Sequence, residues 1–150
     1  LQKEKINYPS DYIKCIAKHE KQFFMKFIDT ILKDKIKLKK QKGESFYWPR
    51  LNSKIDGRIN WNYDAKDIIT FIKSFSQPYS GAFTYIEKFK LKIFKAKFHN
   101  SRKFHPYQNG LIFRENKNSI FVANFKGIIK LEKSSIECSQ KLNLLGKKFL

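Results

Sequence analysis

The chain is poor in cysteine, and this scarcity excludes two classes of protein. Its 150 residues include only Cys15 and Cys138, which stand far apart and in no metal-ligand spacing. A disulfide-stabilised scaffold and a zinc site are therefore not expected, and both cysteines are predicted to be reduced and structural. Glycine and proline are also few, and no low-complexity linker or internal repeat interrupts the sequence. We interpret the break near Ser80 as a change of element type and not as a flexible tether.

Long hydrophobic runs are missing as well. No apolar run approaches the roughly 20 residues that a membrane-spanning helix needs. The segment from Leu1 to Asn7 lacks the apolar core of a secretory signal. We therefore expect a soluble, cytoplasmic protein without a membrane partner. The missing initiator methionine suggests a fragment, a partial gene product or a processed chain.

Acidic residues are scarce: 13 stand against 32 lysines and arginines, which gives a formal net charge of +19. Such a charge favours nucleic acid as a partner, because cations that neutralise phosphates release counterions. Arginine, the better bidentate ligand of phosphate, is nevertheless rare. An AT-rich coding sequence would produce the same surplus of lysine, so the charge alone does not assign a nucleic-acid function. The four arginines are Arg50, Arg58, Arg102 and Arg114.

Apolar residues are abundant, at 41% of the chain with 16% aromatic, which is enough for a core. From Ser10 to Leu32 they recur at intervals of three and four, which predicts a helix with one apolar face and lysines elsewhere. A basic connector, or a short edge strand, is expected over 35–42. A second helix is predicted between the N-cap Asp64 and Pro78. Its buried stripe is Ile68, Phe71, Ile72 and Phe75.

Beyond Gly81 the pattern changes to short β-type runs separated by turn residues. Five runs at roughly ten-residue spacing suit a small barrel of five or six strands. Within one run the apolar positions shift from odd numbers at Leu91 and Ile93 to even numbers at Phe94 and Ala96. This shift predicts a β-bulge or a bend. The predicted strands are 83–86, 91–98, 111–114, 120–123 and 128–131.

No pattern indicates a complete active site. His19, His99 and His105 have no neighbouring serine, cysteine or carboxylate that would form a nucleophile with its base. A glycine-rich phosphate loop is missing too. We therefore predict binding and packing roles, with no catalytic residue and no metal ligand in this chain.

Several short motifs occur in one order and spacing that resemble a known family. Residues 47–50 read Tyr-Trp-Pro-Arg, 57–61 Gly-Arg-Ile-Asn-Trp, 78–83 Pro-Tyr-Ser-Gly-Ala-Phe and 145–149 Leu-Gly-Lys-Lys-Phe. Together with 104–114 they resemble the carboxyl-terminal half of the folate-dependent formyltransferases, which include methionyl-tRNA formyltransferase and the amino-sugar N-formyltransferases. Ser80 replaces the commoner second proline of the family's turn, which loosens the turn without changing its logic. The resemblance spans most of the chain.

The resemblance implies an α+β fold in two parts. Residues 1–80 would be the helical tail of a Rossmann-like catalytic domain, and residues 81–150 a small OB-like antiparallel β-barrel. In the family the first helix covers a parallel sheet, which this chain lacks. We therefore expect an exposed phenylalanine-rich face, with formation of a homodimer or poor solubility as its result.

Roles for single residues also follow from the resemblance. Trp48, Arg50 and Tyr79 belong to segments that face the family's substrate cleft, so we expect them to bind substrate. Arg50 could pair with a phosphate of a nucleotide-linked sugar or with Asp56. Trp61 would pack the second helix against the catalytic sheet. The predicted structural residues are Trp61, Pro78, Gly81 and Phe83.

Members of this family transfer a formyl group from formyl-tetrahydrofolate to an amine. The reaction needs a base and oxyanion donors, and the family's Asn, His and Asp would lie upstream of Leu1. We expect this chain to supply one wall of the acceptor cleft, without turnover of its own. The motifs favour a nucleotide-linked amino sugar whose products enter surface polysaccharides. A methionyl-tRNA acceptor and a free-standing OB-like RNA-binding module are the alternatives.

Overall fold

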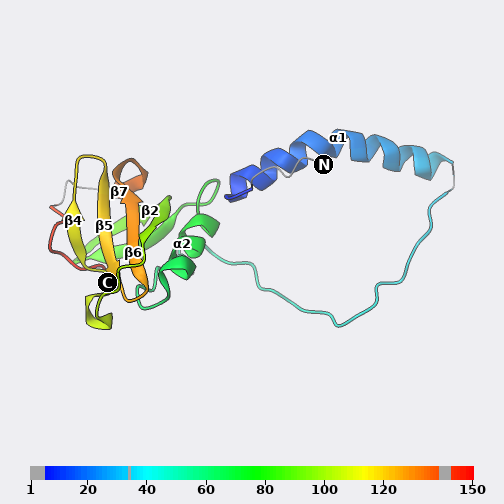
Figure 1. The fold of residues 1–150 in the computed structure, drawn as a ribbon. Coiled ribbons are helices and arrows are strands. Elements are labelled where there is room, and N and C mark those ends of the chain that lie inside the picture. Colours follow the sequence, from blue (N-terminus) through cyan, green and yellow to red (C-terminus); the bar gives the residue numbers. More distant parts are fainter. Residues whose placement is uncertain (1–5, 34, 139–142) are drawn as a thin grey trace.

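The computed structural model describes residues 6–33, 35–138 and 143–150. Within these ranges it contains two α-helices and seven strands, with a 3-10 turn after β3 and another after β6 (Figure 1). The predicted α+β class is confirmed. The elements are α1 (Pro9–Leu32), α2 (Ala65–Ser74), β1 (Ala82–Ile86), β2 (Phe89–Ile93), β3 (Ala96–Asn100), η1 (Pro106–Gln108), β4 (Ile112–Glu115), β5 (Ser119–Asn124), β6 (Gly127–Glu132), η2 (Lys133–Ser135) and β7 (Ile136–Cys138).

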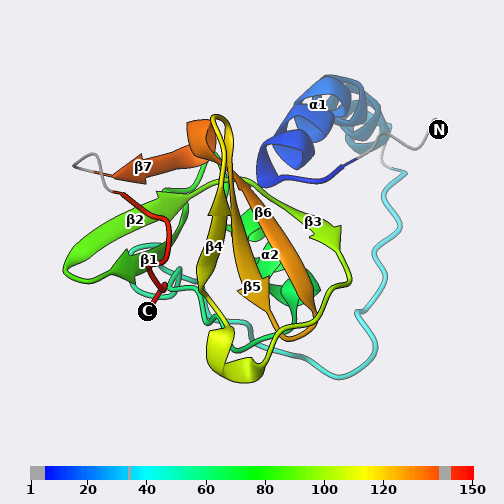
Figure 2. The same ribbon diagram turned by 60° about the vertical axis from the view of Figure 1, so that its left-hand side comes forward.

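The strands form two antiparallel sheets. One has the order β1-β2-β7 and the other β3-β6-β5-β4. Figure 2 shows the two sheets wrapped around α2. The described residues form seven strands in place of the predicted five or six, and closure into one barrel stays a prediction, because no ladder between the described strands joins the two sheets. The Rossmann-like part of the prediction stays a prediction.

The predicted bend in the run 91–98 is confirmed and is larger than a bulge. The run divides at Phe94 and Lys95, so that β2 pairs with β1 and β7 whereas β3 pairs with β6. Ile93 and Ala96 both lie in the core on either side of the break. The shift in apolar parity therefore marks the place where the chain passes from one sheet to the other.

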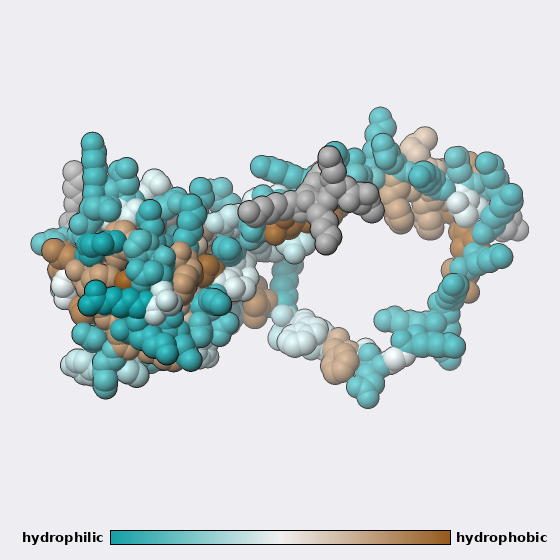
Figure 3. Space-filling view, viewed as in Figure 1, coloured by the Kyte–Doolittle hydropathy of each residue, from teal (hydrophilic) through white to brown (hydrophobic). Residues whose placement is uncertain are grey.

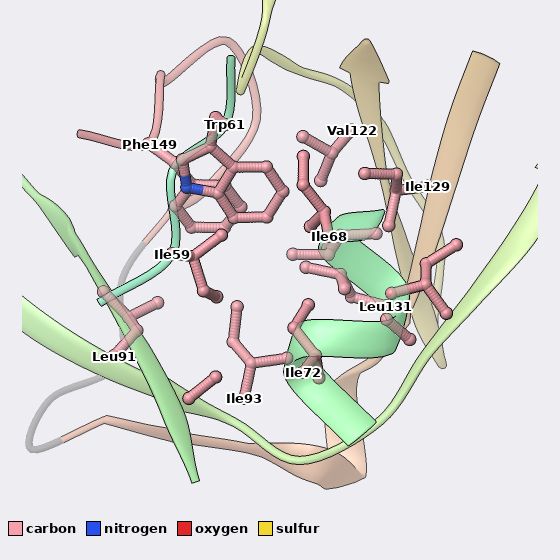
Figure 4. Close-up of a cluster of buried hydrophobic side chains, with 14 of the residues drawn as sticks. Ile59, Trp61, Ile68, Ile72, Leu91, Ile93, Val122, Ile129, Leu131 and Phe149 are labelled. Carbon is pink, nitrogen blue, oxygen red and sulfur yellow. The ribbon is translucent and has the colours of Figure 1, made fainter. Parts of the chain in front are cut away.

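A single hydrophobic core joins α2 to both sheets, as the close-up in Figure 4 shows. The helix starts as predicted, since the Asp64 carboxylate accepts the Lys66 N–H at 2.9 Å. Its stripe is buried, except that Phe71 is only partly so. This core runs from Ile59 to Phe149 and includes residues on both sides of position 80. The domain division at residue 80 stays a prediction, but α2 packs with the strands.

The long helix α1 stands apart from this core, and none of its residues is buried. Its apolar side chains, among them Ile16, Phe24 and Leu32, are exposed, and Figure 3 shows them gathered along one side. Residues 35–50 form an extended segment without regular secondary structure, so the connector is present and the alternative edge strand is not. The expected exposed face is confirmed, and dimerisation stays a prediction. Neither described helix is both long and apolar enough to cross a membrane.

Candidate functional site

Two of the predicted substrate contacts, Arg50 and Tyr79, line the same cavity. This cavity has a volume of about 300 Å³ and lies between the segment at 50–53 and the C-terminal end of α2. The alternative partner of Arg50, Asp56, accepts the backbone N–H of Asn52 at 2.6 Å, and the described residues show no ion pair between Arg50 and Asp56. The remaining lining residues are Leu51, Ser53, Ser74 and Phe75.

A second hollow of about 510 Å³ adjoins the first, because Ser74 and Tyr79 border both. It lies between the start of α1 and α2, where the Ser10 N–H donates to the Gln77 carbonyl at 3.2 Å. Hydroxyl groups, the Asn7 amide and the Lys73 amine are among its polar groups, and no carboxylate of a described residue lines either hollow. Both hollows therefore suit an anionic or hydroxyl-bearing ligand. The second is lined further by Ile6, Asn7, Tyr8, Pro9, Tyr12, Ile13 and Thr70.

The third predicted contact, Trp48, is not brought to this site. Its side chain is 84% exposed and lines neither hollow. It lies in the extended segment, where no element holds its backbone against α2. Substrate binding by Trp48, Arg50 and Tyr79 stays a proposal.

The turn that carries Tyr79 connects α2 to β1. It contains Pro78, whose peptide bond with Gln77 is cis, and Gly81, whose φ is +87°. A Cβ on Gly81 would lie 3.0 Å from the Phe94 ring, and this φ is open to glycine at little cost. The Gly81 N–H donates to the Phe75 carbonyl at 3.0 Å. The end of α2 therefore fixes the turn on which Tyr79 is placed.

Trp61 is buried and packs on the end of the described chain, and its predicted packing against a catalytic sheet stays a prediction. Its ring stacks on Phe149, and its Nε1–H donates to the Thr84 hydroxyl at 2.9 Å. That hydroxyl in turn donates to the Leu150 carbonyl at 3.0 Å. The motif at 57–61 is therefore locked to the last residues of the chain, which the prediction did not include.

Phe83, a predicted structural residue that lies on β1, is also buried. Its backbone pairs with the motif at 57–61, since the Phe83 N–H donates to the Gly57 carbonyl at 2.7 Å and the Ile59 N–H donates to the Phe83 carbonyl at 2.8 Å. Gly57 is buried, and a Cβ there would lie 2.5 Å from the Ser53 carbonyl oxygen. A close backbone approach thus explains the glycine of this motif.

Sequence reasoning missed how the arginines are held. Three of the four lie over aromatic rings: Arg58 over Tyr85 at 5.7 Å, Arg102 over Phe104 at 5.8 Å and Arg114 over Phe121 at 3.7 Å. In the described part of the chain the ion pairs use lysines and no arginine. The Arg114–Phe121 pair depends on strand register, so the sequence alone carries no signal for it.

No metal centre is formed within residues 6–33, 35–138 and 143–150, because no three His, Cys, Asp or Glu side chains come together there. Cys15 is a free thiol, and the Cys138 side chain lies outside what the structure describes. His105 has a structural role, since its Nδ1 accepts the Tyr107 N–H at 3.2 Å.

Comparison with known families and proteins gives one consistent answer. The model of the formyl transferase C-terminal domain matches residues 52–146. The chain is 30% identical over 112 residues to the methionyl-tRNA formyltransferases of Clostridium tetani (strain Massachusetts / E88) and Clostridium botulinum (strain Alaska E43 / Type E3). Each alignment covers 75% of this chain and 35% of the relative, so the chain spans about a third of the length of the curated relatives it matches.

Solved structures show the same fold. A variant of HypX from Aquifex aeolicus matches 73% of this chain and 19% of its own length, with a TM-score of 0.54 at 16% sequence identity. A second HypX variant covers 69% of this chain with a TM-score of 0.51 at 20% identity.

Proposed function

Because the chain belongs to the family of formyl transferase C-terminal domains, we propose that it is the C-terminal region of a methionyl-tRNA formyltransferase. The observation that carries this proposal is the 30% identity over 112 residues to enzymes of that name. This observation supports methionyl-tRNA over the nucleotide-linked amino sugar that the turn at 78–83 had favoured. The fold would be the OB-like barrel of such enzymes, opened into two sheets.

The charge supports a polyanionic acceptor. The chain carries a formal charge of +19, and neutralised phosphates release counterions on binding. Among the described residues no carboxylate lines the two hollows beside Tyr79, so a phosphate or ribose there would meet cations, hydroxyls and the Asn7 amide. A nucleic acid, with its regular row of phosphates, therefore matches the positive charge of this chain.

In the proposed reaction this chain binds and orients the acceptor. The formyl donor, formyl-tetrahydrofolate, and the groups that move protons would be held by the catalytic domain of the whole enzyme. Arg50 would grip a phosphate near the reacting end through its planar fork, and the Tyr79 hydroxyl would bond a sugar or phosphate oxygen. Such contacts increase the rate because they hold the amine near the donor. They take no part in the chemical step itself.

The test measures the binding of methionyl-tRNA and of a nucleotide-linked amino sugar to the 150-residue chain. We expect methionyl-tRNA to bind with an affinity that falls linearly on a plot of log K against log salt concentration. Arg50→Ala should weaken that binding, whereas Arg50→Lys should weaken it less because the charge is kept. Saturable binding of a nucleotide-linked amino sugar, with no binding of tRNA, would contradict the proposal and restore the sugar as acceptor.

A further inference from the structure

A third hollow, of about 430 Å³, lies between the motif at 57–61 and the last residues of the chain. It shares no lining residue with the two hollows beside Tyr79. Its size falls in the range of small-molecule sites, and the proposed function makes no use of it. We call it the asparagine hollow, because three amides and two cations provide its polar side chains. These belong to Asn60, Asn62, Asn109, Arg58 and Lys148.

The floor of the asparagine hollow is the edge of the hydrophobic core. Ile59, Trp61 and Phe149 line it, and each is at most 4% exposed. Figure 4 shows the indole of Trp61 lying on the Phe149 ring with Ile59 next to them. The indole N–H is already bonded to the Thr84 hydroxyl at 2.9 Å. The floor therefore offers apolar contact only, and any polar selectivity of the hollow comes from its rim.

Hydrogen bonds inside the fold fix which amide atoms remain for a ligand. The Phe125 N–H donates to Asn109 Oδ1 at 2.9 Å, so the other amide atom of Asn109 is the donor Nδ2. This nitrogen donates to Asn62 Oδ1 at 3.4 Å, which leaves the Asn62 NH2 group. Asn60 is held in a similar way, since its Oδ1 accepts the backbone N–H of Asn62 at 3.0 Å. The acceptor oxygens are thus used within the fold, and two NH2 groups remain as donors.

Each cation of the hollow is oriented by a tyrosine. The Arg58 guanidinium lies 5.7 Å from the centroid of the Tyr85 ring. Lys148 Nζ lies 4.9 Å from the centroid of the Tyr107 ring and donates to the Tyr107 carbonyl at 2.7 Å. Within the described ranges no Asp or Glu side chain pairs with either cation or lines the hollow. The asparagine hollow therefore keeps two positive charges.

The two cations are held at separate points of the rim. Tyr85 belongs to β1 and Tyr107 to η1. The Leu150 N–H donates to the Tyr85 carbonyl at 2.9 Å, whereas Lys148, two residues earlier, is bonded to Tyr107. Two residues of chain span at most about 7 Å. Two negative groups a comparable distance apart can each meet one cation, but a single compact anion meets both only if one side chain leaves its tyrosine.

We propose that the asparagine hollow binds a small dicarboxylate, with one carboxylate on Arg58 and the other on Lys148. The NH2 groups of Asn60 and Asn62 donate to the same oxygens. Ionised carboxylates only accept hydrogen bonds, which matches a rim whose remaining polar groups only donate. The planar fork of a guanidinium also fits a carboxylate with two parallel hydrogen bonds. This site goes beyond the proposed function and does not depend on which acceptor the whole enzyme uses.

The experiment titrates the 150-residue chain with glutarate and follows its side-chain N–H signals by NMR. We expect saturable shifts of the Asn60 and Asn62 NH2 signals and of the Trp61 indole, with the exposed Trp48 indole unmoved. Acetate has one carboxylate and should bind about tenfold more weakly or worse, because it meets only one cation. Inorganic phosphate that binds as tightly as glutarate would reveal a general anion site and overturn the proposal.

Asn62→Asp tests the donor without removing the structural bond. The variant keeps the oxygen that accepts from Asn109 but places a negative oxygen where the NH2 group was, so the affinity for glutarate should fall about tenfold or more. Arg58→Ala should cause a loss of similar size. An unchanged Trp61 indole signal before titration shows that each variant is folded. If either folded variant keeps its affinity within about twofold of the wild type, the hollow is not the binding site.

Arg102→Ala is the matched control. Arg102 is exposed like Arg58 and lies over Phe104 at 5.8 Å, but it lines none of the three hollows. The terminal carboxylate of Leu150 is common to all variants and does not affect their comparison. Equal losses of glutarate affinity in Arg102→Ala and Arg58→Ala would reduce the effect to net charge and overturn the proposal. A chain that binds glutarate but not methionyl-tRNA would refute the proposed function alone.

Discussion

The indole of Trp61 stacks on the phenyl ring of Phe149, with ring centroids 4.7 Å apart and planes inclined by 13°. Both side chains are almost fully buried, at 4% and 2% exposure. The contact joins the motif before α2 to the segment after β7, which also pairs with Leu111, just before β4, through the isolated Leu111–Lys148 bridge. The C-terminal end of the described chain is therefore anchored in the core through Phe149.

Removing the Phe149 ring should strongly lower the free energy of unfolding of the domain. Phe149→Ala leaves a cavity beside Trp61, and comparable core truncations cost about 3–5 kcal/mol. We expect a loss of that size in the free energy of unfolding, measured by urea denaturation with tryptophan fluorescence. Leu145→Ala, at a 52% exposed side chain, should change stability by less than about 0.5 kcal/mol. Equal effects of the two variants would contradict the packing described here.

Gly81 and Gly146 separate backbone strain from steric clash. Both have positive φ, +87° and +76°, but a Cβ at Gly81 meets the Phe94 ring at 3.0 Å whereas nothing lies within 4 Å at Gly146. Gly146→Ala should cost about 1 kcal/mol from strain alone, and Gly81→Ala about 2–3 kcal/mol. Thermal unfolding of the two variants checks the order. A smaller loss for Gly81→Ala would show that the ring moves aside freely.

The Lys97–Glu132 pair predicts a stability that depends on pH. The pKa of Glu132 is lowered from its ordinary value of 4.5, so its contribution is present above that pH and is lost as the pH falls through the folded-state pKa. The pKa of Lys97 is raised from 10.5, so its contribution is lost only as the pH rises beyond that value.

Glu132→Gln should therefore be less stable than the wild type at pH 7 and equally stable near pH 2. Unfolding midpoints measured across this range give the comparison. A difference between the two proteins that persists undiminished at pH 2 would show that the carboxylate charge is not its cause.

The apolar face of α1 should affect solubility more than stability. Because no α1 residue is buried, Ile16→Ser with Phe24→Ser should change the urea midpoint of the strand core by an amount equivalent to less than about 0.5 kcal/mol. The same changes should reduce self-association, seen by sedimentation velocity, since they break an exposed apolar stripe. Exposed lysines on the same helix, such as Lys14 and Lys21, provide the matched control.

Local signals in the sequence were sufficient for α2 and for the bend after β2. The N-cap at Asp64 and the apolar residues three and four apart belong to one short segment. They can therefore be recognised without knowing how the rest of the chain folds. The parity shift after Ile93 is equally local. Arg50 and Tyr79 share a cavity, but it was the family resemblance and not a local signal that grouped them.

Long-range pairings could not be predicted in the same way. β7 pairs with β2 across some 45 residues and has only three residues of its own. The pairing of Arg114 with Phe121 depends on a register shift between Ile112 and Arg114, which alternation on β4 alone does not reveal. Trp61 stacks on Phe149 in the core, and no rule of sequence spacing connects these two positions.

The core that starts at Ile59 is completed only by Phe149, ninety positions later in the chain. A ribosome must therefore release the chain beyond Glu132, where β6 ends, before the strands that pack on α2 can all cover its inner face. Until then Ile68 and Ile72 are open to water or to a chaperone, because such distant contacts form late and slowly. Arrest of translation within the last described strand would leave a polypeptide with exposed apolar side chains, which chaperones or proteases would recognise.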